Sequence, residues 1–561
     1  MLFLQKNMQT SMLLLIALSL TSHIKLAAQS IPSTADVSRI ETFEPATDVA
    51  WQSPKTNIPT LDPKLAIPED ADSIRFQLEA VLVAGVSAFT EKELRDIWTP
   101  YLGEETSLRT IWSMAQTITE RYHAKGFFLS RAVVPAQTIE NGTVKIEVTE
   151  GYIDKVLFTE DRRYLAPLQR WANRITADRP ITADALESLV LSMNDLPGIQ
   201  YRTLLEKSED GKPGSVQLLL KPEDEPSRLY WNFDNYGSEF LGPYRMSVLF
   251  EKSWLPYHKT VFSSTVSMPI EELRQFSVSH TTALTPYLAL AVSGSHTVSR
   301  PGGALEPFDI KTQSNSLQAG IDYQPIRQRN TNLTLSAHLT GKNTSGNAFE
   351  NPLTRDRIRA IRLKLDYSRF DDWQGYNSVR LQLRQGLSFM GGSKPGDENL
   401  SRDEAEPDFT ALRFNYARYH MLSAHWIAIG KLSGQYSPAP LYSAEEFGVG
   451  GSQYGRAYDS SELLGDNGFA GSLEIRYQHL GPWLTITCTP YVFYELGKVW
   501  DVDSQGTAES AASAGYGFKL KHRDNISADM GIAWPLTRPV EEPLYGGNKD
   551  PRFLLQATWE F

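Results

Sequence analysis

From residue 228 to the C-terminus, apolar and polar residues alternate one by one along short segments. Leu333, Leu335 and Leu339 alternate with threonine, serine and histidine, a two-residue period that is typical of a β-strand with one apolar face. Residues 361–367 and 379–384 repeat the pattern, with arginine and lysine on the polar face. About sixteen such segments follow one another, so the sequence predicts an antiparallel β-structure.

The lengths of the connections between these segments alternate as well. Alternation alone fits a soluble sandwich as well as a membrane barrel. Short turns on one rim and long polar loops on the other are typical of a transmembrane barrel, and an even strand number allows the sheet to close without free edges. The sequence therefore predicts a 16-stranded antiparallel transmembrane β-barrel over residues 226–561. The short connections are residues 325–330, 371–376, 420–425, 481–482 and 522–524, and the long ones are residues 297–310, 342–356, 390–408, 437–465 and 535–552.

The last strand of this barrel ends on aromatic residues. Residues 553–561 alternate and place Trp559 and Phe561 near the C-terminus. Aromatic side chains gather at both interfaces of membrane barrels. We therefore interpret Trp559 and Phe561 as the C-terminal signal of the barrel.

The preceding region has helical periods instead. A strand is expected at residues 74–83, a capping box at Thr90 and Glu93, a helix over residues 108–122, and strands at 130–135 and 144–148 around a turn at 140–142. The same order returns with a strand at 152–158, helices at 164–175 and after Thr182, and a hairpin of residues 200–206 and 215–220. Two α+β domains are predicted, at residues 73–151 and 152–225.

The N-terminus has the features of an export signal. Lys6 precedes the apolar residues 12–20, and small residues follow as far as Ala28. This order is typical of a secretory signal peptide, which we expect at residues 1–28. Residues 29–72 are rich in proline and serine without an apolar period, so they are expected to form a linker or a plug segment.

Composition narrows the function classes. A net charge of -11 argues against binding of nucleic acid, which normally needs a basic surface. A single cysteine, Cys488, excludes an internal disulfide and is expected to be a small apolar side chain. Neither a phosphate-binding glycine loop nor a metalloprotease or hydrolase motif is present. We therefore expect no enzyme, cofactor or metal. Glu445, Glu446 and the acidic residues 403–408 could bind calcium, but we interpret them as solvated loop tips.

One motif of the first domain consists of Tyr122, Gly126, Phe127, Ser130, Arg131, Pro135, Gln137, Gly142, Glu150 and Gly151. These residues resemble the POTRA motif of the outer-membrane transporters of two-partner secretion, the hemolysin activation/secretion protein family within the POTRA-plus-barrel superfamily. Residues 195–199 resemble the family pattern in the second domain. In the barrel, residues 455–459 and 465–468 are similar to the tip of the family's long sixth loop, and residues 493–497 to its barrel-wall motif.

The resemblance implies that the loop tip is locked to the barrel wall by an ion pair between Arg456 and Glu495. Tyr458, Asp459 and Gly497 belong to the same two motifs. Ala457 stands where the family usually has glycine, and Glu495 where it has aspartate. From the sequence alone, the better interpretation of Arg456 is one more solvated loop arginine, and the resemblance reverses that preference.

The resemblance also implies a function and a set of partners. Periplasmic POTRA domains would bind an unfolded secreted exoprotein with a β-helical fold by strand addition, and the barrel would carry it across the outer membrane. The other expected partners are outer-membrane lipid and the barrel-assembly machinery, and the expected state is a monomer. A barrel-assembly insertase is the alternative, and a passive porin or receptor is a third hypothesis. In some relatives an N-terminal plug fills the pore, although the prolines of residues 29–72 argue against a long plug helix here.

Overall fold

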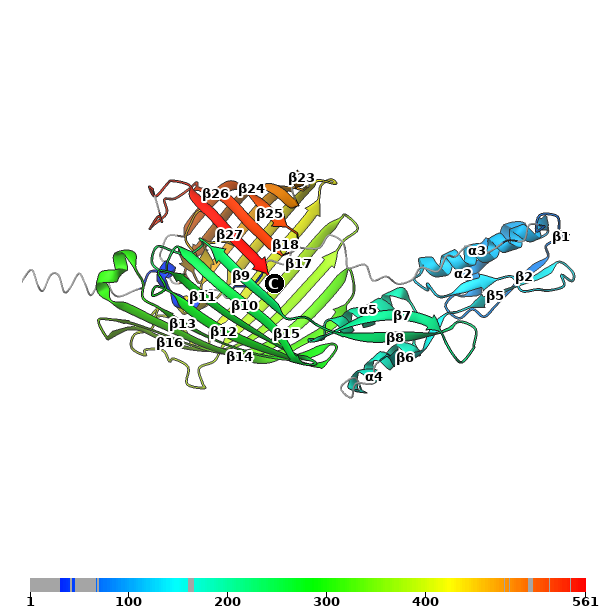
Figure 1. Cartoon of the computed structure of the whole chain (residues 1–561), viewed down its shortest axis with the longest axis horizontal. Coiled ribbons are helices and arrows are strands. Elements are labelled where there is room, and N and C mark those ends of the chain that lie inside the picture. The colour runs from blue at the N-terminus through cyan, green and yellow to red at the C-terminus, as the bar shows by residue number, and fades with distance from the viewer. Residues whose placement is uncertain are drawn as a thin grey trace, which may run out of the picture.

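The computed structural model describes residues 31–40, 43–45, 67, 70–159, 166–478, 480–483, 485–502, 508–523, 525–544 and 546–561. The predicted signal peptide lies outside the described residues, as does most of the segment 29–72. Two small α/β units extend one after the other from one end of a closed β-barrel (Figure 1). No helix in the described part of the chain is long and apolar enough to cross a membrane.

The first unit has helices on one face of a small mixed sheet. The sheet order is β2-β5-β4, with β2 parallel to β5 and β4 antiparallel to it. The expected strand at residues 74–83 is divided in two, because β1 pairs with β3 instead of continuing into β2. The elements are β1 (Arg75–Gln77), β2 (Ala80–Ala84), α2 (Glu91–Leu94), β3 (Glu105–Ser107), α3 (Leu108–Ala124), β4 (Arg131–Val133) and β5 (Thr143–Thr149).

Helix α3 supplies most of the core of the first unit. Its apolar residues recur every three or four positions, and Ile111, Ile118 and Tyr122 are fully buried against β5 residue Ile146. The predicted capping box of Thr90 and Glu93 is present at the start of α2. The helical period and the cap were therefore predicted correctly from sequence.

The second unit repeats the arrangement with the sheet order β6-β8-β7. The Oγ1 of Thr182 accepts the Ala185 backbone N–H at 3.2 Å and caps α5, as predicted. The helix expected at residues 164–175 is shorter, because the described part of it turns into a 3-10 helix at Asn173. The elements are β6 (Tyr152–Phe158), α4 (Ala166–Ala172), α5 (Ala183–Asn194), β7 (Ile199–Lys207) and β8 (Ser215–Asp224).

The turn after α5 fixes the second unit to the barrel. Asp195 makes a bidentate ion pair with Arg327, the last residue of barrel strand β14 (Ile310–Arg327), with Oδ1 accepting from Nη2 at 3.0 Å. The carbonyl of Pro197 accepts the backbone N–H of Tyr257 at 2.8 Å. Residue 198 must be glycine, because its φ is +83° and a Cβ would lie 2.9 Å from a barrel side chain. Residues 195–199, which resemble the family pattern, thus form the junction.

Sixteen antiparallel strands close the barrel. Each strand pairs with its neighbour in sequence, and β22 and β23 are two parts of one wall strand because both pair with β24. The strands are β9 (Arg228–Asp234), β10 (Tyr244–Leu255), β11 (His258–Met268), β12 (Arg274–Thr285), β13 (Leu288–Ser299), β14 (Ile310–Arg327), β15 (Thr331–Ala348), β16 (Asn351–Phe370), β17 (Gly375–Gly386), β18 (Thr410–Met421), β19 (Trp426–Tyr436), β22 (Asn467–Tyr477), β23 (Leu480–Trp483), β24 (Ile486–Trp500), β25 (Glu509–His522), β26 (Ile526–Pro535) and β27 (Arg552–Glu560).

The two faces of the wall differ as the alternation predicted. Large apolar side chains such as Leu317, Leu363 and Leu473 are exposed on the outer face, where hydrocarbon replaces water. The inner face is polar, and hydroxyl pairs such as Ser247 with Thr265 are buried there. An apolar exterior around a polar lumen is the arrangement of a membrane barrel.

The last strand closes the barrel against the first. β27 pairs with β9 from Gln556, opposite Asp234, to Glu560. Phe561 then donates its backbone N–H to the Leu229 carbonyl at 2.8 Å, and Trp559 lies opposite Trp231. The predicted C-terminal residues therefore lie in the seam, where their backbone groups complete the ring of hydrogen bonds.

The prediction of a long loop at residues 342–356 is wrong. Residues 342–356 form the end of a β15–β16 hairpin, which turns at Phe349 and Glu350 with φ values of +46° and +70°. The strands continue there without an apolar face, since neither face of this projecting hairpin has to meet hydrocarbon. Alternation was therefore a good signal for the membrane-facing part of the strands and not for their full length.

The carboxylate of Glu150 holds the segment between β2 and α2 against helix α3. Its Oε1 accepts from the Tyr122 hydroxyl at 2.7 Å and from the Ser87 and Ala88 backbone N–H groups at 2.7 and 2.9 Å. Burial by itself would raise the pKa of Glu150, but the hydrogen bonds from Ser87, Tyr122 and Ala88 together outweigh burial and lower it. Burial of the ring, together with the hydrogen bond to Glu150, raises the pKa of Tyr122.

We predict that Glu150→Gln lowers the stability of the first unit by about 1–2 kcal/mol at neutral pH, because an amide accepts these bonds less strongly. The lowered pKa means that the carboxylate contributes fully above about pH 4.5 and loses its contribution as the pH falls through the folded value. The difference between the wild type and the variant should therefore shrink in acid. Hydrogen exchange of residues 87–127 in the full chain measures it, with the half-exposed Glu147→Gln as the control. A difference that grows on acidification would contradict the prediction.

Candidate functional site in the barrel lumen

The long connection between β19 and β22 folds back into the barrel. We call residues 437–466 the lumenal loop. It contains a small antiparallel pair of strands, β20 (Phe447–Val449) and β21 (Leu463–Gly465). Phe447, Val449 and Leu463 are buried in one cluster with wall residues Tyr491 and Phe493 of β24. The loop therefore has an apolar contact with the wall in addition to its polar ones.

Glycines on the inner wall make room for this contact. A Cβ at residue 497 would come within 2.6 Å of Val449 Cγ1, and one at residue 468 within 2.5 Å of the Phe447 ring. Neither glycine has a left-handed φ. Because these two glycines have no side chain, β20 can lie directly against β22 and β24.

The tip of the loop is held by the carboxylate of Glu495. Arg456 Nε lies 2.7 Å from Glu495 Oε1, and the backbone N–H groups of Gly455 and Arg456 donate to Oε2 at 2.9 Å each. Ser513 of β25 donates its hydroxyl to the same oxygen at 3.1 Å. Glu495 is fully buried, so four donors compensate its removal from water. The structure thus brings together Arg456 and Glu495, as the resemblance implied.

A second carboxylate, Glu474, completes the surroundings of Arg456. Its Oε2 lies 2.8 Å from Arg456 Nη2, while its Oε1 accepts from Arg476 at 2.6 Å. The guanidinium also lies 3.8 Å from the ring centre of Phe493, a cation–π distance. The sequence reasoning missed Glu474. Its only signal is a charged residue at a lumen-facing position of β22, and its partner becomes visible only once the register with β24 is known.

The two departures from the family motif fit the tip. The left-handed residue in this turn is Gly455, with φ of +84°, and Ala457 is buried without a positive φ. Alanine therefore causes no backbone strain at position 457. Glu495 reaches both the side chain of Arg456 and the backbone of the turn, so its longer side chain keeps the contact.

The next two residues connect the loop to other strands. Tyr458 is fully buried, and its hydroxyl lies 3.1 Å from the Arg538 carbonyl and 3.2 Å from that of Ala512. Asp459 Oδ1 accepts from Arg552 Nη1 at 2.6 Å. Arg552 lies at the start of β27 and also donates to the Gly237 carbonyl at 2.8 Å. The tip is therefore tied to the seam between the last strand and the first.

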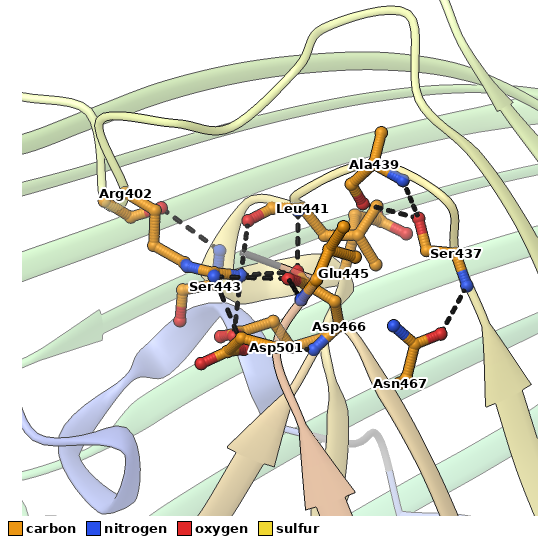
Figure 2. Close-up of polar contacts among 12 residues, drawn as sticks. Arg402, Ser437, Ala439, Leu441, Ser443, Glu445, Asp466, Asn467 and Asp501 are labelled. Carbon is orange, nitrogen blue, oxygen red and sulfur yellow. Dashed lines mark hydrogen bonds and ion pairs between the residues drawn. The ribbon is translucent and has the colours of Figure 1, made fainter. Parts of the chain in front are cut away.

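The base of the lumenal loop is held by Arg402, which comes from the connection between β17 and β18. Figure 2 shows its guanidinium directed at Asp466 and Asp501, and it also ion-pairs with Glu446 at 2.9 Å. Asp466 is fully buried and accepts the Leu441 backbone N–H at 2.7 Å. The three carboxylates lie close enough together to hold a metal ion, but Arg402 already provides a cation to all three.

The prediction that Glu445 and Glu446 are solvated loop tips is wrong. Glu445 is 1% exposed and pairs with Arg362 and Arg384 on the barrel wall, and Glu446 is also buried. Sequence suggested a loop tip because the segment is polar and lies between strands. The loop instead turns inward, where wall arginines compensate its carboxylates. The acidic residues 403, 404, 406 and 408 are exposed as predicted.

Residues 31–40, the N-terminal segment, lie in the lumen beside the loop, in two short 3-10 turns. Arg39 donates to the Ser443 carbonyl at 2.6 Å, and Asp36 accepts from the Ser443 hydroxyl at 2.8 Å. Val37 is buried against Leu241 and Leu273, which lie in the connections between β9 and β10 and between β11 and β12. In Figure 1 this segment, in dark blue, lies in the half of the barrel away from the α/β units.

Most motif residues of the first α/β unit hold its frame. Gly151 donates its N–H to Ser130 Oγ at 3.1 Å, and a Cβ at position 151 would lie 2.3 Å from that of Leu129. Gly126 has a φ of +89°, and its carbonyl accepts the Ala183 N–H of the second unit at 2.8 Å. Ser130 and Gly151 therefore hold the end of the first unit together, and Gly126 links it to the second.

The remaining motif residues have similar structural contacts or point to solvent. The side-chain amide of Gln137 donates to the Lys145 carbonyl at 2.8 Å and accepts its N–H at 2.7 Å, which continues the sheet by one more pair. The others are Phe127, which packs on the rings of Phe89 and Tyr122, Gly142 in the predicted turn at +66°, Pro135 after β4, and Arg131, which is exposed.

Comparison with known proteins identifies this architecture. Residues 214–520 match the family described as haemolysin secretion/activation protein ShlB/FhaC/HecB, and residues 76–151 match the ShlB-type POTRA domain. The heme/hemopexin transporter protein HuxB of Haemophilus influenzae (strain 86-028NP) is 22% identical over 475 residues, which cover 80% of this chain and 81% of HuxB. The outer membrane transporter CdiB of Dickeya dadantii (strain 3937) is 21% identical over 459 residues, which cover 78% of this chain and 79% of CdiB.

Solved structures show the same fold. CdiB from Escherichia coli superposes with a TM-score of 0.66 at 14% identity and covers 96% of both chains. BamA from Haemophilus ducreyi lacking POTRA domains 1–3 gives a TM-score of 0.51 at 11% identity, covering 87% of this chain and all of that one. The family match covers more than half of the chain, and the solved structures share its fold. The chain therefore belongs to the haemolysin secretion/activation family of outer-membrane β-barrel transporters with periplasmic POTRA domains.

Proposed function

We propose that this protein is the pore of a two-partner secretion system that exports one unfolded exoprotein through its own lumen. The lumenal loop carries this proposal. It is locked inside the barrel by the contact between Arg456 and Glu495, and removing one partner of such a buried pair costs about 3–5 kcal/mol. A passive porin has to let solutes pass at all times, so it does not require so strong an internal closure. A pore for a long polypeptide needs one that opens only for its partner.

The resting pore is closed by two elements. The lumenal loop and the N-terminal segment lie side by side in the lumen and bind each other through Arg39, Asp36 and Ser443. We infer that residues 31–40 act as a plug, and that both elements move when a partner chain passes. The plug uses short 3-10 turns in place of a helix, in keeping with its proline content.

The POTRA domains, which we place at residues 73–151 and 152–225, would capture the partner by strand addition. In the described part of the first domain, β2 is an edge strand that pairs only with β5. Leu82 on this strand is 58% exposed. An open edge with an exposed apolar side chain can accept an extended segment through backbone hydrogen bonds.

The partner class follows from the relatives. HuxB is called a heme/hemopexin transporter protein and CdiB an outer membrane transporter, and transporters of this kind work with secreted exoproteins. For this chain we propose a large exoprotein with a β-helical fold. Outer-membrane lipid would surround the apolar band, the barrel-assembly machinery would insert the chain, and the protein would work as a monomer without enzymatic activity.

An insertase for other barrels is the second candidate, because the barrel also superposes on BamA. The superposition on CdiB has the higher TM-score and covers 96% of the chain. Two N-terminal units also favour the secretion transporter.

Comparative proteomics of the culture supernatant and the outer membrane tests the function directly. When the protein is deleted, we expect the loss of one large exoprotein from the supernatant, because a dedicated pore serves one partner. Complementation with the wild-type chain is the control. Loss of several barrels from the membrane would support the insertase, and a loss of solute permeability alone would support a porin.

The lock itself should be needed for export. We predict that Arg456→Ala reduces export at least tenfold, because it removes the ion pairs with Glu495 and Glu474. Gly497→Val should have the same effect, since its side chain displaces β20 from the wall. Gly430→Ala on β19 is a matched control, because a Cβ there meets no atom within 4 Å. Heat-modifiable gel migration verifies that each barrel is folded, and normal export by folded Arg456→Ala would refute the lock.

Capture through the first POTRA domain should be separable from conduction. Deleting residues 74–151 is expected to leave channel conductance in planar bilayers and to abolish binding of the exoprotein found by proteomics. Leu82→Glu is the finer variant, because a charge on an edge strand opposes pairing. We expect it to weaken binding at least fivefold. Undiminished affinity in the deletion variant would place capture elsewhere.

A further inference from the structure

One side of the lumen carries an excess of positive charge. Lys342, Arg362, Arg384 and Arg413 lie on the adjacent strands β15, β16, β17 and β18. The three arginines alternate with outward apolar residues, as Arg384 does with Leu383, which is 39% exposed on the outer face. We call these four residues the cationic wall.

The lumenal loop binds this wall in the manner of a peptide ligand. Glu445 Oε1 lies 2.6 Å from Arg362 Nη2, and its Oε2 lies 2.6 Å from Arg384 Nη1. The wall also binds the backbone. The Glu445 carbonyl accepts from Arg384 at 3.2 Å, and the Glu446 carbonyl accepts from Arg413 at 3.4 Å. Beside the wall, Gln435 of β19 donates to the Glu445 carbonyl at 3.0 Å. The contacts therefore recognise one carboxylate and two successive peptide carbonyls.

The wall offers more positive charge and more donors than this loop segment uses. Among the ion pairs between described residues, Lys342 and Arg413 take part in none, and Glu445 is the only carboxylate paired with the wall. Arg384 is 2% exposed, and its buried Nε has no hydrogen-bond partner among the described atoms. Buried guanidinium groups are costly without a compensating anion. Removal of the loop would therefore leave the wall in need of another carboxylate.

We propose that the cationic wall is a binding site for the transported chain, and that an extended segment with an acidic side chain replaces residues 443–446 there when the loop leaves. This proposal rests on the proposed function. The site takes a polypeptide with Asp or Glu, because planar guanidinium groups bind a carboxylate with two oxygens and also bind peptide carbonyls.

The exchange couples arrival of the partner to opening. Glu445 belongs to the same chain and therefore competes at a high effective concentration. A free acidic segment binds weakly while the loop is docked. Once it replaces Glu445, the wall charges stay compensated and the loop loses one of its anchors. The transported chain binds the open arrangement more tightly than the closed one and thereby stabilises the open arrangement.

A peptide copied from this chain tests the site without knowledge of the exoprotein. The probe is a fluorescent peptide of residues 440–449, and its matched partner carries Gln in place of Glu445. Binding is measured by fluorescence anisotropy on the purified full-length protein in detergent. We expect the acidic peptide to bind the Glu445→Gln protein at least tenfold more tightly than the wild type, and at least tenfold more tightly than the Gln peptide does.

A second substitution identifies the wall as the place of binding. Adding Arg384→Gln to the Glu445→Gln protein should abolish the preference for the acidic peptide. Arg380→Gln is the matched control, because Arg380 lies four residues earlier on the same strand and pairs with Asp366. Arg362→Gln serves if the Arg384 variant does not fold, as judged by heat-modifiable migration. Equal affinity for the two peptides would overturn the site, and so would an unchanged preference in the folded Arg384 or Arg362 variant.

The outcomes also separate this proposal from the proposed function. If deletion of the protein removes an exoprotein and the acidic peptide shows no preference, the secretion function holds and the site is refuted. If the peptide preference is found and no exoprotein is lost, the proposed function fails, and with it the role of the wall in transport.

Discussion

Hydrocarbon cannot form hydrogen bonds with a polypeptide backbone, and this constraint determines the rest of the structure. Every strand edge has to be paired inside the membrane, so the sheet closes and its last strand meets its first. Closure places one face of every strand against lipid and the other in the lumen. The apolar face produces the alternation seen in the sequence, while the inner face is free to carry charge. The lumen therefore becomes the place where ion pairs such as that of Arg456 with Glu495 can hold a loop.

The lumenal loop is held at several points that depend on different strands. Its tip binds β24 through Glu495, Asp459 binds β27 through Arg552, and its base is clasped by Arg402. These contacts lie along the whole loop, so breaking one leaves the others in place. Their charges are buried, and each partner left alone would be costly. A loop anchored in this way is stable at rest, and its release requires that its contacts be replaced.

The sequence correctly predicted the elements that follow from the spacing of apolar residues. Its predictions were wrong where the surroundings of a strand or loop change along its length. The strands of the barrel, the helix with Tyr122 and the cap at Thr182 follow from local patterns. The continuation of β15 and β16 through residues 342–356 does not follow from a local pattern, because a hairpin outside the hydrocarbon needs no apolar face. The burial of Glu445 and the role of Glu474 depend on contacts between distant strands, which one sequence does not contain. Arg456 and Glu495 were found through family resemblance, since nothing local distinguishes Arg456 from a solvated arginine.

The resemblance also marks a different set of residues from those that would meet a partner. In the first POTRA domain, Ser130 and Gly151 hold the backbone together, and Gln137 extends the sheet. The edge of β2 and the wall residue Arg384 lie outside every motif, although they face the space an incoming chain would occupy. Strand addition uses backbone groups, which any sequence supplies. A family motif in such a transporter therefore describes the frame and the contacts of the lumenal loop, while the recognition that we propose for the partner rests on backbone and on charge.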